Sequence, residues 1–228
     1  RAAHENQWPL DARTSNPRRI AGVGAGPAGL SAAVELARIG HAVTLYEKSH
    51  QIGGQFNMAK RIPGKEEFNE TLRYFNRQLE LLGVAVHLNT DVQAGELLTY
   101  DEVVLATGVK PRAWNVPSAD EDARVVSYID VLKGQVELGD TIAIIGAGGI
   151  GFDVAEFFVH DGRHDFYETW GIDTQLEGRG GLNAPADVTS ERTVHMLQRS
   201  AKKMGGGLGK TTGWIHRMGL KKAGVQMH

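Results

Sequence analysis

Two short glycine-rich loops have the residue types and the spacing that suit the binding of nucleotide phosphates. The first occupies residues 24–29, after the apolar segment 19–23, and the second occupies residues 146–151, after segment 141–145. In a G-x-G-x-x-G loop the first glycine permits a tight turn, the second lets the backbone approach a pyrophosphate, and the third lets helix and strand pack closely. The following helix then offers free N–H groups and a positive dipole end to the phosphates. Each loop predicts a dinucleotide site, although a purely structural strand–helix–strand unit could use the same glycines.

A carboxylate follows the first loop at the distance that a dinucleotide site requires. Glu47 comes 23 residues after Gly24, at the end of the apolar segment 42–46, and could accept hydrogen bonds from ribose hydroxyls. Segment 52–55 reads Ile-Gly-Gly-Gln, a second tight loop that could approach a cofactor. The residues expected to hold the first cofactor are therefore Gly24, Gly26, Ala28, Gly29, Glu47, Gly54 and Gln55.

Basic residues follow the strand that is expected after the second loop. Arg199 comes after the apolar segment 193–197 and Gln198, and Lys202 and Lys203 lie beyond it. A carboxylate at this place would repel a 2′-phosphate, whereas arginine and lysine attract one. The pattern therefore favours NADPH over NADH, and a solvated basic turn is the alternative. The expected NADPH-binding residues are Gly146, Gly148, Gly149, Gly151, Arg199, Lys202 and Lys203.

Two other patterns look like binding motifs but lack a required part. Segment 205–211 ends in Gly-Lys-Thr, as a phosphate-binding ATPase loop does, but Met204 stands where that loop requires its first glycine. His160 and His164 have the spacing of metal ligands, with acidic residues nearby, but they belong to a polar segment. We expect a solvated loop there rather than a metal site.

Alternating strands and helices have to position the two loops. Short apolar runs indicate strands, and apolar residues at helical spacing indicate helices between them. The expected strands are 19–23, 42–46, 84–88, 101–106, 141–145 and 193–197, and the expected helices are 30–39, 65–82, 152–159 and 211–222. Pro27 can occupy the first turn of the first helix, where its missing N–H costs nothing. This alternation predicts an α/β protein with two Rossmann-like, parallel-sheet nucleotide-binding domains.

Two dinucleotide loops about 120 residues apart fit a flavin site followed by a pyridine-nucleotide site, that is, FAD and then NADPH. The Ala-Thr-Gly sequence that ends at Gly108 resembles the return strand of two-dinucleotide-binding flavoproteins. In that group Val92 would touch the adenine through its backbone, so Val92, Thr107 and Gly108 join the expected FAD-binding residues. Disulfide reductases of this architecture need a Cys-x-x-Cys pair, and the absence of cysteine excludes that branch.

The same pattern divides the chain into segments. We expect a linker or arm over 1–17, the N-terminal part of an FAD-binding domain over 18–116, a crossover over 117–139 and an NADPH-binding domain over 140–228. Both domains are expected to be incomplete at their C-terminal ends. Residues 160–192, with scattered Gly, Pro and charged residues, are expected to interrupt the second domain as an insertion, to which the sequence assigns no role.

Composition limits the remaining classes of function. The chain has 228 residues, 29 glycines, no cysteine and a formal net charge of -2 at pH 7. The near-neutral charge gives no reason to expect a nucleic-acid partner. The lack of cysteine excludes a disulfide scaffold and a cysteine-ligated iron–sulfur cluster within this stretch. No apolar run approaches the roughly 20 residues of a membrane span, and we expect a cytoplasmic protein.

Several longer motifs resemble those of bacterial NADPH-dependent 2,4-dienoyl-CoA reductases, which belong to the old-yellow-enzyme-like flavoproteins. They are IGGQFNMAK at 52–60, IPGKEEF at 62–68, GGIGFD at 148–153, WGID at 170–173 and GLGKTTGWIHR at 207–217. The last motif is the most specific, because it is long and a generic nucleotide-binding fold does not require it.

The resemblance implies a protein longer than this chain. In that family an N-terminal barrel carries FMN, the 2,4-dienoyl-CoA site and the proton donors, and a 4Fe-4S cluster follows it. This chain would then be the electron-input region, which passes hydride from NADPH to FAD for the reduction of unsaturated fatty acyl-CoA. No catalytic acid or base and no metal ligand is expected within residues 1–228.

Two alternatives stay open at this point. The chain could be the matching domain of another fused flavoprotein, such as a trimethylamine dehydrogenase-like enzyme or a glutamate synthase small subunit. Some such domains keep a nucleotide only as a structural ligand. The chain could also be a non-enzymatic nucleotide-binding scaffold.

Overall fold

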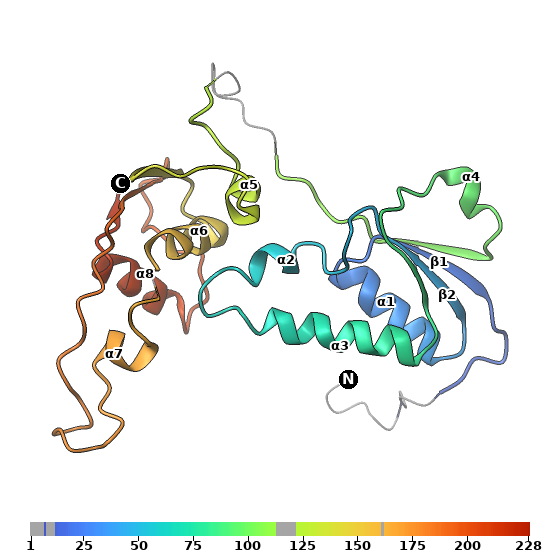
Figure 1. The fold of residues 1–228 in the computed structure, drawn as a ribbon, viewed down its shortest axis with the longest axis horizontal. Coiled ribbons are helices and arrows are strands. Elements are labelled where there is room, and N and C mark those ends of the chain that lie inside the picture. Colours follow the sequence, from blue (N-terminus) through green and yellow to red (C-terminus); the bar gives the residue numbers. More distant parts are fainter. Residues whose placement is uncertain (1–6, 8–11, 113–121, 161) are drawn as a thin grey trace. The chain divides into compact units, whose positions relative to one another are not determined.

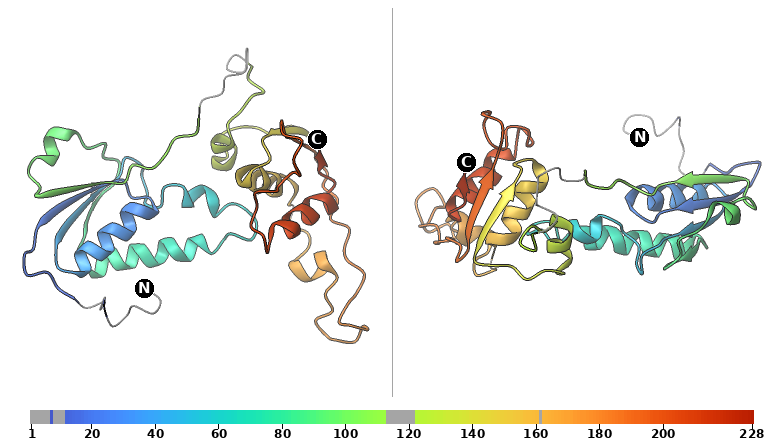
Figure 2. Two further views of the ribbon diagram at one scale, coloured as in Figure 1. Left: turned by 180° about the vertical axis from the view of Figure 1, so that it is seen from behind. Right: turned by 90° about the horizontal axis from the view of Figure 1, so that it is seen from above.

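The computed structural model describes residues 7, 12–112, 122–160 and 162–228, which form two compact units (Figures 1 and 2). The first unit comprises Arg1–Lys60 and Gly64–Asp122, and the second comprises Arg61–Pro63 and Ala123–His228. Much of the arm expected over 1–17 and part of the crossover expected over 117–139 lie outside the described residues. The expected bounds of the FAD and NADPH domains stay predictions, because compactness does not show which cofactor a unit binds.

A four-stranded parallel sheet forms the centre of the first unit. Its strands are β1 (Arg19–Val23), β2 (Ala42–Tyr46), β3 (Ala85–His87) and β4 (Glu102–Leu105), in the order β3-β2-β1-β4. The last residue of β1, Val23, pairs with Tyr46 on β2 and with Leu105 on β4. The carboxyl ends of these three strands therefore meet at one edge of the sheet, where parallel α/β proteins place their ligands.

Two helices cover one face of this sheet (Figure 1), namely α1 (Pro27–Arg38) and α3 (Phe68–Leu81). They share a face because right-handed crossovers advance in one direction from β1 through β2 to β3. Their contacts with the sheet bury an apolar core that includes Leu30, Val34, Leu45 and Leu79. The shorter helices α2 (Phe56–Ala59) and α4 (Ala94–Leu97) lie in the connections.

A three-stranded parallel sheet forms the centre of the second unit. Its strands are β5 (Thr141–Ile145), β6 (Thr193–Leu197) and β7 (Gln226–Met227), in the order β5-β6-β7. Helix α6 (Gly149–Val159) follows β5 and packs against β5, β6 and α8 (Gly213–Lys222). Phe152, Phe158, Met196 and Leu220 are buried between these elements. Two shorter helices are α5 (Tyr128–Lys133) and α7 (Phe166–Trp170).

The two parallel sheets confirm the predicted α/β fold class. The strands with the predicted bounds are 19–23, 42–46, 141–145 and 193–197. Helix α1 begins at Pro27, which confirms the expectation that this proline lies in the first helical turn, where its missing N–H leaves no hydrogen bond unmade. Helices α5 and α7 were not predicted, because segments of 6 and 5 residues are too short to show a helical period.

Candidate nucleotide-binding sites

The first glycine loop makes a turn that only glycine accommodates at its first position. Gly24 has φ +101°, and its N–H donates to the carbonyl of Tyr46 at 2.8 Å. A Cβ at this position would overlap the carbonyl of Ala106 at the end of β4, with the Thr107 Cα only 3.2 Å away. The turn therefore packs directly against the end of β4. The predicted residues Thr107 and Gly108, both exposed, lie beside the loop for this reason.

The other loop glycines bring α1 close to the sheet edge. A Cβ on Gly29 would lie far inside 3.0 Å from the carbonyl of Gly24, and 3.4 Å from the Ala106 Cβ. Gly26 is the extended N-cap of α1, and Ala28 lies exposed in the first helical turn. The first N–H groups of a helix have no intrahelical acceptor, and the dipole adds positive charge there. The loop can therefore bind a pyrophosphate through its backbone.

Glu47, directly after β2, connects that strand to the first loop by a hydrogen bond. One carboxylate oxygen accepts from the N–H of Ala25 at 2.7 Å, and the other accepts from the N–H of Ser49 at 2.8 Å and from the Ser49 hydroxyl. The side chain is only 7% exposed. Burial raises the pKa of Glu47, but the hydrogen bonds from Ser49 and Ala25 outweigh burial and hold that pKa below its usual range. Glu47 is therefore an anion at neutral pH, with lone pairs left on both oxygens for ribose hydroxyls.

Segments distant in the sequence complete the first site. The N–H of Gly53 donates to the carbonyl of Ala25 at 2.7 Å, and a Cβ on Gly54 would lie 2.9 Å from the Gly26 Cα. Gln55 is exposed as the N-cap of α2. Thr90 donates its N–H to the carbonyl of Glu47 at 2.9 Å, and the half-buried Val92 follows two residues later.

The second glycine loop repeats the geometry of the first. Gly146 has φ +115°, and its N–H donates to the carbonyl of Leu197 at 2.9 Å. A Cβ on Gly151 would lie far inside 3.0 Å from the carbonyl of Gly146. Gly148 is the extended N-cap of α6, and a Cβ there or on Gly149 would meet no atom within 4 Å. The N-terminus of α6 is thus open to a ligand, as the prediction for this loop requires.

The predicted basic residues lie at the carboxyl end of β6. Arg199, Lys202 and Lys203 are all exposed on the bend that follows the strand. The residue in register with Glu47 is Gln198, not Arg199, because each comes directly after its strand. Gln198 is thus a functional candidate in addition to the predicted basic residues. Its sequence signal is its place directly after Leu197, the last residue of β6, as Glu47 comes directly after Tyr46.

The donors at each loop are compatible with the cofactor expected there, and the assignment of FAD and NADPH to the two loops stays a prediction. The first combines a close backbone approach at Gly26 and Gly54 with an ionised carboxylate, which suits FAD. The second combines open backbone at Gly148 with three exposed cations and no carboxylate directly after β6, which suits NADPH. The chemistry of the donors thus differs between two loops of the same backbone shape.

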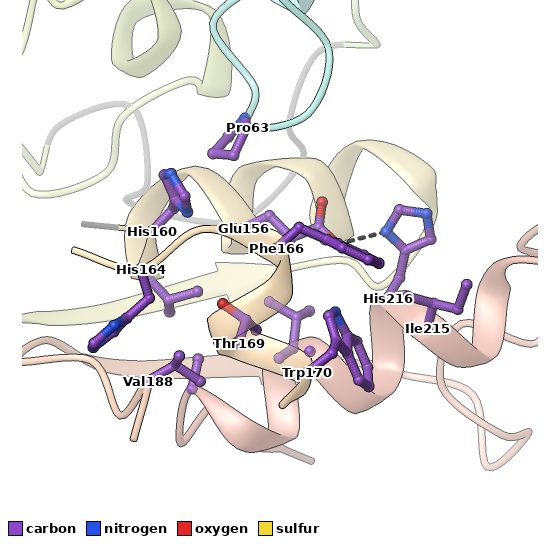
Figure 3. A pocket seen from close by; sticks show the side chains of 14 residues that line it. Pro63, Glu156, His160, His164, Phe166, Thr169, Trp170, Val188, Ile215 and His216 are labelled. Carbon is purple, nitrogen blue, oxygen red and sulfur yellow. Dashed lines mark hydrogen bonds and ion pairs between the residues drawn. The ribbon is translucent and has the colours of Figure 1, made fainter. Parts of the chain in front are cut away.

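A cavity of about 350 Å³ lies in the second unit, away from the glycine loop (Figure 3). Its mainly apolar lining comes largely from the C-terminal half of α6, from α7 and from α8. His160 and His164 also line it, and His216 Nδ1 lies 2.5 Å from Glu156 Oε1 at its edge. Thus the segment that the sequence places in a solvated loop forms part of a cavity wall. Among the described residues, no group of three His, Cys, Asp or Glu could hold a metal ion.

The fold and the two glycine loops define an α/β protein with two Rossmann-like, parallel-sheet units. The model of the family "Pyridine nucleotide-disulphide oxidoreductase" matches residues 18–228, and the chain belongs to this family. Because the chain has no cysteine, it contains no disulfide of its own for the chemistry in the family's name. No helix in the described part of the chain is long and apolar enough to cross a membrane.

Similar proteins are oxidoreductases of much greater length. The chain is 34% identical over 158 residues to a metal reductase of Desulforamulus reducens, covering 67% of this chain and 24% of that protein. It is 33% identical over 150 residues to an NADH oxidase of Thermoanaerobacter brockii, covering 64% and 23%. A solved complex of 2-naphthoyl-CoA reductase with 2-naphthoyl-CoA matches with a TM-score of 0.77 and 27% identity, covering 98% of this chain and 30% of that one. The chain thus spans less than a third of each of these proteins.

Proposed function

We propose that this chain is the electron-input region of an NADPH-dependent flavin oxidoreductase, with FAD on the first glycine loop and NADPH on the second. The proposal is carried by one observation: the two glycine loops have the same backbone geometry, but the residues that follow the second strand of each unit differ in charge. Glu47 follows β2, whereas Gln198 and Arg199 follow β6. A carboxylate suits the free hydroxyls of an adenosine ribose, and a neutral amide followed by cations suits a 2′-phosphate.

The residues of the chain bind and orient the two dinucleotides. The N-termini of α1 and α6 would take the pyrophosphates, Glu47 would accept from the FAD ribose, and Arg199, Lys202 and Lys203 would neutralise the 2′-phosphate. Bound FAD supplies a flavin ring that can accept hydride from a reduced nicotinamide. The chain contributes placement in this scheme, and we assign it no acid or base.

The finer proposal is that the parent enzyme reduces 2,4-dienoyl-CoA. The motif at 207–217 supports it, as does the similarity to a reductase solved with a bound CoA thioester. Under this proposal FMN, a 4Fe-4S cluster and the acyl-CoA site lie outside residues 1–228.

The test of the coarser proposal is a visible spectrum of the purified chain, reconstituted with FAD, before and after anaerobic addition of NADPH. We expect a yellow protein that NADPH bleaches and that then reduces ferricyanide. A yellow protein that NADPH leaves oxidised would refute the assignment of the second loop. A chain that binds adenine nucleotides but never FAD would favour a scaffold.

The finer proposal needs the parent protein with its barrel. We expect NADPH oxidation that depends on added 2,4-hexadienoyl-CoA and that saturated hexanoyl-CoA does not support. Rapid reduction of FAD by NADPH without any turnover of the dienoyl-CoA would leave the electron-input role intact and refute the substrate.

A further inference from the structure

Gln198 occupies the same backbone position in the second unit that Glu47 occupies in the first. The strand-end pairs Val23–Tyr46 and Ile145–Leu197 correspond. The N–H of Glu47 donates to the carbonyl of His87 at 2.9 Å, and the N–H of Gln198 donates to the carbonyl of His228 at 2.9 Å. Because the glycine loops also have the same backbone geometry, the two side chains start from equivalent backbone positions beside their loops.

The two side chains use that position differently. Glu47 reaches back to its glycine loop and accepts the N–H of Ala25. The amide nitrogen of Gln198 instead donates to the carbonyl of Ser200 at 2.7 Å and to the carbonyl of Lys202 at 2.6 Å. The N–H of Lys202 donates to the hydroxyl of Ser200 at 3.2 Å, which closes the bend further. One side chain thus spans the bend from residue 198 to residue 202.

The basic side chains on this bend have no helix or strand to fix them. Arg199, Lys202 and Lys203 all lie outside regular secondary structure, and all are exposed. Ordering long, exposed cations around a phosphate costs conformational entropy. The amide of Gln198 lowers part of this entropy cost before the ligand binds, because its two hydrogen bonds hold the backbone of residues 200 and 202 in one arrangement.

Only an amide can make this pair of hydrogen bonds without adding charge. The NH₂ group of glutamine has two donors, and both acceptors here are backbone carbonyls. Glutamate has no donor when ionised, so its oxygens would face the two carbonyls and also repel a 2′-phosphate. Alanine would lose the two bonds but add no repulsion.

We propose that Gln198 is a positioning residue that makes the bend at 198–203 selective for a nucleotide 2′-phosphate, by tying the carbonyls of Ser200 and Lys202 together. This inference rests on the proposed function of the second loop. Gln198 would then contribute to selectivity for the 2′-phosphate through the backbone of the bend, in addition to the contribution of the cationic side chains.

The experiment compares two ligands that share the adenosine and differ in the 2′-phosphate. Binding of adenosine 2′,5′-bisphosphate and of 5′-AMP to the chain is measured by calorimetry for the wild type, Gln198→Ala, Gln198→Glu and the control Gln175→Ala. Gln175 is an exposed glutamine of the same unit. Urea denaturation of each variant checks that the fold is kept.

We expect Gln198→Ala to weaken the bisphosphate about tenfold and 5′-AMP less than twofold, since the lost bonds act only on the bend. Gln198→Glu should weaken the bisphosphate further, about a hundredfold, because it adds repulsion to the lost order. Gln175→Ala should change neither ligand.

Failure of the inference and failure of the proposed function give different results. A wild type that binds both ligands equally, or neither, refutes the 2′-phosphate site, and the role of Gln198 falls with it. A wild type that prefers the bisphosphate, together with a Gln198→Ala variant that keeps the full preference, overturns only the inference. Equal weakening of both ligands by Gln198→Ala would also overturn it, because the glutamine would then support the fold in general.

Discussion

Replacement of Gly151 by alanine tests whether the second loop requires the close contact between the start of α6 and the turn at Gly146. In the structure a Cβ on Gly151 would lie far inside 3.0 Å from the carbonyl of Gly146, a separation at which real Cβ atoms are essentially never found. The obstacle is backbone, held by a hydrogen bond from the Gly146 N–H to Leu197, so it cannot rotate away as a side chain could. The start of α6 must move off the turn.

We expect Gly151→Ala to lower the free energy of unfolding by about 3 kcal/mol, at the upper end of the usual cost of overpacking. With a urea dependence of about 2 kcal/mol per M, the midpoint of the unfolding transition should fall by about 1.5 M. Gly149→Ala is the matched control, because it lies two residues away in the same helix and its Cβ would meet no atom within 4 Å. It should leave the midpoint unchanged or raise it, since alanine lowers the entropy of the unfolded chain.

The assay is urea denaturation of both variants, followed by circular dichroism and tryptophan fluorescence. A Gly151→Ala midpoint within 0.3 M (about 0.6 kcal/mol) of the wild type would refute the close approach of α6 to the turn. An equal loss in both variants would show that any side chain in this helical turn is harmful, whatever its distance from Gly146.

Three further predictions concern the charges and glycines of the two sites. Glu47→Gln should lower the free energy of unfolding by about 1–2 kcal/mol at pH 7, because hydrogen bonds to the Glu47 anion hold its pKa down. The wild type loses this contribution as the pH falls below the usual glutamate range towards the lowered pKa, so the urea midpoints of the two proteins should converge in acid. Midpoints that stay equally far apart at all pH values would contradict the reasoning. Arg199→Glu should weaken NADPH binding more than tenfold and spare NADH, as measured by fluorescence titration, and an equal loss for both coenzymes would disprove the 2′-phosphate contact. Gly26→Leu should abolish retention of FAD in the visible spectrum, because its side chain would fill the space between Gly26 and Gly54, whose Cα would lie 4.0 Å from a Cβ at Gly26. Gly95→Leu in α4, where a Cβ meets no atom within 4 Å, should retain the flavin.

The local elements could be predicted because their signals are short-range. A buried apolar strand that ends in a glycine, such as β1 before Gly24 or β5 before Gly146, is bounded by residues next to it in the chain. The predicted bounds of β1, β2, β5 and β6 are correct for this reason. The predictions were less accurate for β3 and β4, which are shorter than the expected strands 84–88 and 101–106. The ends of β3 and β4 depend on their pairing with β2 and β1, and the residues within each strand do not indicate where that pairing stops.

The sequence by itself determined that the chain has two glycine loops, with an acidic residue after the strand that follows the first loop and basic residues after the strand that follows the second. These features depend only on residue type and spacing. Only the tertiary structure decided which distant groups meet them. Gly54 lies against Gly26, and Thr107 beside Gly24, through the loop at 52–55 and the pairing of β4 with β1. The structure also shows that Gln198, not Arg199, is in register with Glu47 and that its amide closes the basic bend. The physical reason is that a side-chain hydrogen bond depends on where the backbone carbonyls point, which the folded sheet and bend set.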